Sequence, residues 1–180
     1  MFEDFEGQSA ANWTPAMGSW AACKPSANAT WEYCANSASA NVSLAGSPAW
    51  RDYYVQAYVN LDSDAGGGVA ILGRVQDATH FYQAELRQDG SGNKAWMLWK
   101  NSGGSWSYIN SGYFNYAARN YYLLRLSMVG SSIGVSISTD WGASFQPLGT
   151  GSDTEFGAGK VGLRSWGSPA RFDNVEVRLQ

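Results

Sequence analysis

The sequence predicts an all-β fold, a two-sheet antiparallel β-sandwich, on three observations. No window shows the i, i+3, i+4, i+7 apolar spacing of a helix over three turns. Short apolar or alternating runs occur instead, bounded by Gly, Asn, Asp, Ser and Pro. The 180 residues include 21 Gly, 9 Trp and 10 Tyr, and these numbers fit many turns and strand-favouring rings. Turn signals at intervals of about 8–12 residues predict about ten to thirteen strands.

The predicted strands follow one another along the whole chain. An opening strand near Phe2–Glu6 and two strands carrying the cysteines precede the longer runs. The longer runs are Arg51–Asn60, Gly67–Val75, His80–Gln88, Lys94–Lys100, Trp106–Ser111, Asn120–Val129, Ser132–Ser138, Lys160–Trp166 and Ala170–Leu179. No linker, repeat or low-complexity tract divides them, so residues 1–180 are predicted to form a single domain. Met1 directly precedes the first strand, so we expect this domain to be excised from a larger secreted multi-domain protein.

The charge and hydropathy of the chain argue against two classes of partner. The net charge is −3 and no basic stripe is present, so a nucleic-acid partner is not expected. No apolar run reaches the roughly 18 residues of a membrane span, so no membrane partner is expected. The chain is expected to be a monomer.

The two cysteines, Cys23 and Cys34, lie eleven positions apart around a turn-type segment, Lys24–Asn28. Antiparallel strands on either side of that turn would bring them within disulfide reach. Two buried free thiols are the alternative. Two cysteines and the single histidine, His80, supply too few ligands for zinc. A disulfide indicates an oxidising compartment and therefore secretion.

Strand alternation separates core residues from outward ones. If the apolar positions of each strand face the core, the opposite positions present planar rings and groups able to form paired hydrogen bonds. The candidate carbohydrate-binding residues are Tyr54, Tyr58, Arg74, Gln83, Glu85, Arg164 and Trp166. Rings stack on sugar faces, and Arg, Gln and Glu bond sugar hydroxyls. The alternative is that these are ordinary solvent-facing strand residues.

Two further aromatic segments bear on the predicted orientation of exposed rings. Trp96 and Trp99 are three apart on one predicted strand, so one of them should face outward. Ser138–Phe145 fits the S-x-D-x-G-x-x-aromatic pattern of an Asp-box turn, in which Asp140 accepts backbone N–H bonds. We interpret that turn as structural, and Trp141 within it as a weak candidate for binding.

Several segments, taken in order, resemble laminin-G-like and concanavalin-A-like jelly rolls of bacterial secreted polysaccharide-degrading proteins. The segments are Phe2–Gly7, Trp13, Trp50–Tyr53, Gly73–Asp77, Phe81–Tyr82, Tyr122–Leu126, Gly159–Arg164 and Phe172–Val177. The resemblance implies a carbohydrate-binding module, similar to the fructan-binding type, with a polysaccharide partner and a covalently attached catalytic domain. The group also includes glycosidase-like members, so the fold alone does not decide function.

Many such modules hold a structural calcium ion where the first and last strands meet. The matching carboxylates here are Asp4 and Glu6 in the first strand and Asp173 in the last. With backbone carbonyls they could supply the six to eight oxygens that Ca²⁺ requires. The alternative is a buried Asp173 bonded to backbone N–H groups.

Enzyme chemistry has less support in the sequence. The paired-carboxylate motif of sandwich-fold glucanases is absent, and His80 alone is a poor basis for a serine hydrolase. A polysaccharide lyase using Tyr54, Tyr58 and Arg74 remains open. The predicted function is therefore a non-catalytic carbohydrate-binding module that targets an attached enzyme to a polysaccharide. A lyase or glycosidase of the same fold, and a structural or adhesion domain, are the alternatives.

Overall fold

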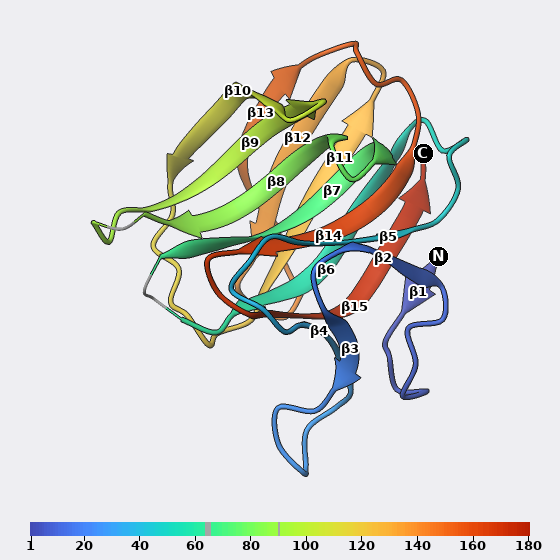
Figure 1. Cartoon of the computed structure of the whole chain (residues 1–180). Coiled ribbons are helices and arrows are strands. Elements are labelled where there is room, and N and C mark those ends of the chain that lie inside the picture. The colour runs from blue at the N-terminus through green and yellow to red at the C-terminus, as the bar shows by residue number, and fades with distance from the viewer. Residues whose placement is uncertain (64–65, 90) are drawn as a thin grey trace.

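The computed structural model describes residues 1–63, 66–89 and 91–180 and shows two antiparallel sheets packed face to face (Figure 1). Within these ranges there are fifteen strands and no helix, so no helix could cross a membrane. The strands are β1 (Phe2–Glu3), β2 (Trp13–Met17), β3 (Trp20–Cys23), β4 (Glu32–Ala35), β5 (Asn41–Ala45), β6 (Tyr53–Leu61), β7 (Gly67–Asp77), β8 (His80–Gln88), β9 (Lys94–Ser102), β10 (Ser105–Tyr113), β11 (Tyr122–Val129), β12 (Ser132–Ser138), β13 (Gln146–Ser152), β14 (Lys160–Trp166) and β15 (Ala170–Leu179).

The two sheets interleave distant parts of the chain, as in a jelly roll. Sheet A has the order β13-β12-β11-β6-β15-β4-β3, with β1 added beside β15. Sheet B has the order β10-β9-β8-β7-β14-β5-β2. The last strand, β15, lies between β6 and β4, so early, middle and final segments meet in one sheet (Figure 1). The predicted two-sheet antiparallel sandwich is confirmed.

The main hydrophobic core lies between the sheets. Val55, Ala57 and Val59 of β6 point into it, as the alternation predicts, and all three are fully buried. Trp96 of β9 joins the core, whereas Trp99 lies on the other face of its sheet. One of the two rings therefore faces outward, as predicted. Burying the alternate positions of strands such as β6, β12 and β15 supplies the main driving force for the fold.

A β-bulge in β7 overturns one prediction. The predicted outward orientation of Arg74 is wrong: its side chain is only 2% exposed. The pairing register shifts between Gly73 and Asp77, and Arg74 takes a left-handed φ of 47°. A bulge adds one residue to a strand and so reverses its in–out alternation. Val75, predicted to lie in the main core, packs instead in an outer cluster with Leu72 and Phe81.

The buried Arg74 guanidinium is fully engaged with protein groups. It donates to the carbonyl oxygens of Arg51 (3.1 Å) and Phe156 (3.2 Å), and it pairs with the Asp52 carboxylate at 3.2 Å. A buried charge is tolerated when it is paired and hydrogen-bonded in this way. Arg74 therefore fastens β7 to neighbouring segments.

Three strands are missing from the predicted set: β2, β5 and β13. Pro15 lies in β2 and Pro147 in β13, and proline argues against a strand in a sequence pattern. Both strands are sheet edges, where a proline without an N–H is tolerated.

The Cys23–Cys34 disulfide is present, as predicted. It joins neighbouring antiparallel strands β3 and β4, with the two Cα atoms 6.0 Å apart. The bond joins two strands at the end of sheet A. It stabilises the fold because it restricts the conformations of the unfolded chain.

We expect reduction of this disulfide to lower the free energy of unfolding by about 2–3 kcal/mol, the chain-entropy effect for a loop of this length. Urea unfolding with and without dithiothreitol measures it. Dithiothreitol should have no effect on the Cys23→Ala, Cys34→Ala double variant. An equal effect on that variant would show that the reductant acts elsewhere.

Candidate functional site

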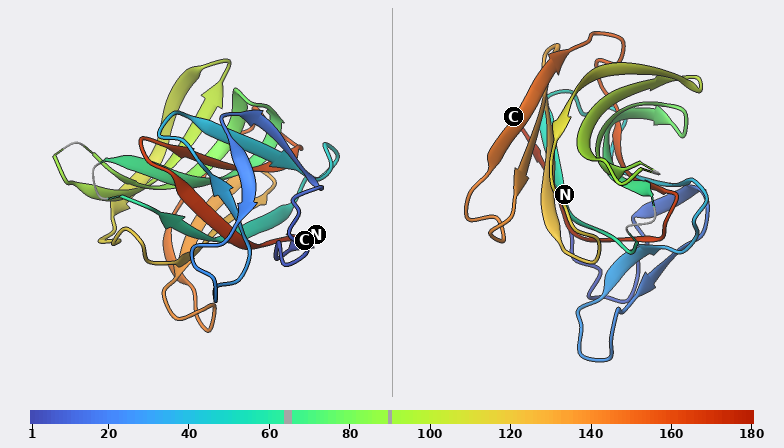
Figure 2. Two further views of the ribbon diagram at one scale, coloured as in Figure 1. Left: turned by 60° about the horizontal axis from the view of Figure 1, so that its bottom comes forward. Right: turned by 90° about the vertical axis from the view of Figure 1, so that its left-hand side faces the viewer.

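A pocket lies on the outer face of sheet B, the face turned away from sheet A. Strands β8 to β10 curve strongly on this side of the molecule (Figure 2, right view). The pocket has a volume of about 220 Å³ and draws its lining from four strands. The lining residues are Gln83, Glu85 and Arg87 of β8, Trp99 of β9, Trp106 of β10, and Arg164 and Trp166 of β14.

Strand β8 forms the floor of the pocket. Its alternate residues Tyr82, Ala84 and Leu86 belong to the main core, so Gln83 and Glu85 must point the other way. Both polar side chains are nevertheless buried, with 1% and 2% of their surface exposed. Buried polar groups require partners, and the pocket walls supply them.

The Trp166 indole N–H donates a hydrogen bond to the Glu85 carboxylate across the floor. Burial raises the pKa of Glu85, while Trp166 and the nearby arginines Arg164 and Arg87 oppose that rise. Gly68 of β7 lies against this pair, and a Cβ atom there would collide with both side chains. The contact between Glu85 and Trp166 therefore depends on a residue without a side chain.

Rings and guanidinium groups form the walls. Trp99 and Trp106 meet edge to face, with ring centroids 6.3 Å apart. The Arg164 guanidinium lies 5.0 Å from the Trp106 ring and donates to Gln83 Oε1 at 3.3 Å. Arg87 lies 5.2 Å from the Trp166 ring. Stacking of this kind holds long side chains in fixed directions.

This arrangement suits recognition of a small polar ring. Trp106 remains 43% exposed and offers an apolar face, while Arg and Gln or Glu groups offer donors and acceptors beside it. Among the lining residues Glu85 is the single carboxylate, whereas the usual glycosidase mechanisms use two.

Four of the seven predicted binding residues meet in this pocket: Gln83, Glu85, Arg164 and Trp166. The other three lie elsewhere.

Tyr54 and Tyr58 do alternate outward from β6, as predicted, but β6 belongs to sheet A. Tyr54 is covered by the Arg125 guanidinium, 4.4 Å from its ring. Arg74 is buried among backbone carbonyls. The three residues considered for a lyase therefore do not converge on one site.

Three lining residues were not among the predicted binding set. Arg87 shares the outward positions of β8 with Gln83 and Glu85, so the alternation already indicates its direction. Trp99 was one of two candidates for the outward ring of β9. Trp106 lies on the neighbouring strand, where a register shift between Tyr108 and Asn110 obscures the alternation.

Carboxylates gather where β1, β4 and β15 meet. Strands β1 and β15 are neighbours, as predicted, and Asp173 is 9% exposed. Burial, and after it the charges of Glu32, Glu6 and Asp4, raise the pKa of Asp173 to about 7. Its side chain also accepts a hydrogen bond of 2.7 Å from the Asn174 N–H.

The donor set of this cluster fits a hard cation. Glu32 Oε2 is buried and has no hydrogen-bond partner among the described residues. No three of the described carboxylates Asp4, Glu6, Glu32 and Asp173 have oxygens within 4.8 Å of one another, so a cation would require side chains to rotate inward. The one closer group in the described chain, Cys23, Glu32 and Cys34, has its sulfurs in the disulfide.

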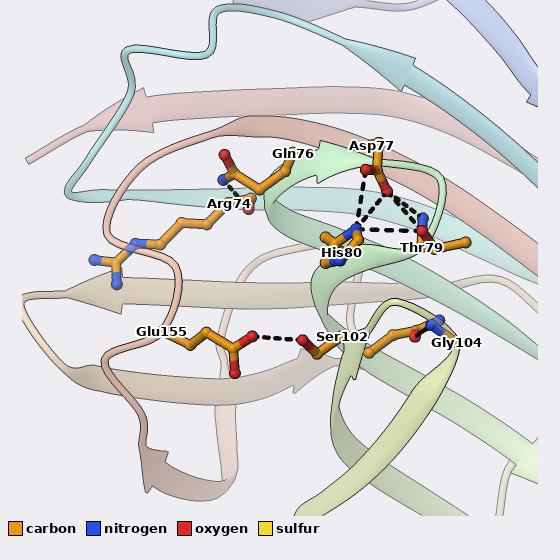
Figure 3. Close-up of polar contacts among 9 residues, drawn as sticks. Arg74, Gln76, Asp77, Thr79, His80, Ser102, Gly104 and Glu155 are labelled. Carbon is orange, nitrogen blue, oxygen red and sulfur yellow. Dashed lines mark hydrogen bonds and ion pairs between the residues drawn. The ribbon is translucent and has the colours of Figure 1, made fainter.

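The single histidine is held in a turn. His80 Nδ1 lies 2.9 Å from both Asp77 carboxylate oxygens and 3.2 Å from the Thr79 hydroxyl (Figure 3). The nearby Ser102 hydroxyl donates to the Glu155 carboxylate (Figure 3). Each group thus has a structural partner of its own.

The comparisons with known proteins agree with this geometry at the level of the fold. No protein-family model matches the chain, and no curated protein matches it by sequence. Solved structures do match, and they share the jelly-roll β-sandwich fold of this chain.

Carbohydrate binding module CBM66 from Bacillus subtilis superposes with a TM-score of 0.76 at 19% identity, over 93% of this chain and 95% of that one. The GH43 protein BlXynB from Bacillus licheniformis gives a TM-score of 0.73 at 13% identity, over 99% of this chain but 39% of that one. The exoplasmic/lumenal domain of VIP36, in a Ca²⁺/Man-bound form, gives 0.72 at 9% identity, over 94% of this chain and 83% of that one. The TM-scores show a shared fold, and identities this low show no more than that.

We expect Gly68→Ala to separate the Trp166 indole from the Glu85 carboxylate, because the new Cβ occupies the space of both groups. Overpacking of this kind costs about 1–3 kcal/mol of stability. Near-ultraviolet circular dichroism and urea unfolding measure the change. Gly157→Ala is the matched control, since no atom lies within 4 Å of a Cβ there. Identical spectra for both variants would contradict the described packing.

Proposed function

We propose that this chain is a non-catalytic carbohydrate-binding module whose ligand occupies the pocket on the outer face of sheet B. The observation that carries the proposal is the pocket itself. Three tryptophans and two arginines surround a buried glutamine and a buried glutamate in one hollow. Rings that stack on sugar C–H faces and forked donors and acceptors for hydroxyl pairs are the components that sugar recognition requires.

The solved structures with this fold support a carbohydrate partner. One is itself a carbohydrate-binding module, and another is a mannose-bound lumenal domain. The fold also forms part of a longer GH43 chain, which supports the proposal that this domain is attached to a catalytic domain. The disulfide supports a secreted protein. Modest affinity would suffice, because tethering raises the local concentration of an attached enzyme on its polysaccharide.

We expect Trp166→Ala to weaken binding at least about tenfold, because it removes a wall of the pocket and leaves Glu85 without its indole partner. Affinity gel electrophoresis in pectin, xylan, β-glucan and fructan measures it. Tyr113→Ala is the matched control, because Tyr113 is 76% exposed and lies outside the pocket lining.

Arg164→Ala should behave like Trp166→Ala, since Arg164 bridges the Trp106 ring and Gln83. If no polysaccharide retards the wild-type protein, the carbohydrate-binding proposal fails. Retardation that both substitutions leave at wild-type strength on every polysaccharide would place the ligand outside this pocket.

We also propose that Asp173, with Asp4, Glu6 and Glu32, holds a structural Ca²⁺ ion. The support is the gathering of carboxylates around the buried Asp173, together with the buried Glu32 Oε2, which accepts no hydrogen bond from the described residues and lies 4.0 Å from Arg171 Nε. A bound divalent cation would neutralise the mutual repulsion of these groups and join β1, β4 and β15. It would stabilise the fold without taking part in chemistry.

The pKa of Asp173 gives this proposal a pH signature. Its pKa is raised from 3.8 to about 7 in the folded protein, so the folded state holds a proton that the unfolded state releases. The contribution of Asp173 to the free energy of unfolding is therefore greatest below about pH 4 and falls as the pH rises toward 7. Ca²⁺ replaces the proton, so we expect it to raise the Tm more at pH 8 than at pH 5.

Thermal unfolding with Ca²⁺, with Mg²⁺ and with chelator measures this effect. Asp173→Asn should abolish both the calcium effect and the loss of stability toward pH 7. Asp77→Asn is the control. Asp77 lies in another part of the chain, and its pKa is lowered to about 2. A calcium effect that persists in Asp173→Asn would exclude this site.

A further inference from the structure

A second pocket lies on the outer face of sheet A. The hydrophobic core separates it from the pocket on sheet B. It has a volume of about 610 Å³ and is formed by β6, the segment 114–122 and the turn after β12. Its aromatic residues are Tyr58, Phe114, Tyr121, Tyr122 and Trp141. None of them lines the pocket on sheet B.

Trp141 stands at the tip of the Asp-box turn and is 76% exposed. The turn is tightly bonded beneath it. Ser138 Oγ donates to Asp140 Oδ1 (2.6 Å) and accepts from the Gly142 N–H (2.9 Å). The Ser144 N–H and hydroxyl both donate to Asp140, at 3.0 and 2.6 Å. The ring is therefore presented to solvent on a rigid support.

The backbone of Trp141 adds a second sign of function. Its φ is 61°, in the left-handed region where a bulky residue is a genuine outlier. Glycine or asparagine would satisfy the same turn with less strain. Backbone strain beneath a large, mostly exposed apolar ring is typical of functional positions.

Neighbouring rings extend Trp141 into a platform. Tyr58 of β6 lies beside it, with ring centroids 5.6 Å apart. Tyr121 is fixed by a short hydrogen bond of 2.5 Å from its hydroxyl to Glu32. The platform is thus assembled from three separate segments whose positions the fold determines.

Polar groups surround this platform without protein partners. The side chains of Asn115, Asn120 and Thr139 line the pocket and are exposed. They form no hydrogen bond to any side chain or backbone group that the structure describes. Amides and hydroxyls beside a ring are the groups that bond the hydroxyl fringe of a stacked sugar.

The charged residues around the pocket bear on whether it binds neutral sugars or uronates. Hydrogen bonds from Ser138 and Ser144 lower the pKa of Asp140 to about 2, so this rim carboxylate is ionised at neutral pH. Asp173 lies directly across the strand pair from Tyr58. Arg119, the cation among the lining residues, is directed to the Asp62 carbonyl oxygen, to which its Nε donates at 3.2 Å. The ionised Asp140 directly precedes Trp141 in the chain, so we expect negative charge beside the stacking ring to disfavour uronates.

From these observations we propose that the outer face of sheet A carries a second glycan-binding site, for a neutral polysaccharide chain, with Trp141 and Tyr58 as its stacking platform. The site is independent of the sheet B pocket, since the two faces lie on opposite sides of the sandwich (Figure 2). One domain would then hold two polysaccharide chains.

The test uses the whole chain with Trp141→Asn, Trp166→Ala and the double variant. Asparagine is chosen because it tolerates the left-handed backbone, so the Tm should be retained or raised. Affinity gels contain xylan, mixed-linkage β-glucan, xyloglucan or polygalacturonate. Tyr113→Ala again serves as the control for loss of an exposed ring.

We expect Trp166→Ala to remain retarded by at least one neutral polysaccharide, and the double variant to lose that retardation about tenfold or more. Polygalacturonate binding should be unchanged by Trp141→Asn. If Trp141→Asn has no effect in either background, the second site is refuted whatever the sheet B pocket does. If Trp141→Asn alone removes all retardation, the second site stands and the pocket on sheet B is not the binding site. A loss confined to polygalacturonate would refute the neutral-sugar assignment.

Discussion

Strand β8 is buried on both of its faces, and the rest of the structure depends on this constraint. Tyr82, Ala84 and Leu86 fill the core, so the residues between them have one direction left. That direction is the hollow of sheet B, where Gln83 and Glu85 become buried polar groups that must be satisfied. Trp166 and Arg164 satisfy them and are thereby fixed in place. Core packing on one side of the strand thus positions the binding groups on the other.

The alternation of polar and apolar residues was enough to predict the fold class, most long strands and the directions of most side chains. Where it failed, the cause was local geometry that residue types do not encode. The bulge at Arg74 reversed the alternation of β7, placing an arginine inside and Val75 outside. The edge strands β2 and β13 were not predicted, because each contains a proline. Proline argues against a central strand but is tolerated in an edge strand.

Alternation also says which residues face outward without saying from which sheet. Tyr58 and Glu85 were both predicted to face outward, yet the strand order puts them on opposite faces of the molecule. That order joins segments far apart in the chain, and nothing local in the sequence fixes it. The same limit applies to Trp141. Its Asp-box motif correctly indicates a rigid turn, but its exposure depends on how the turn sits against β6.

The back-to-back placement of the two pockets has a consequence for how the domain could act on a material. Sites on one face reinforce each other on a flat, ordered surface, because both can be engaged at once. Sites separated by the thickness of a sandwich cannot, and a planar fibre would occupy only one of them. In a hydrated matrix of loose chains the same geometry would make the domain a junction between strands. Its effect would then appear in the viscosity of the matrix as well as in the affinity for a single chain.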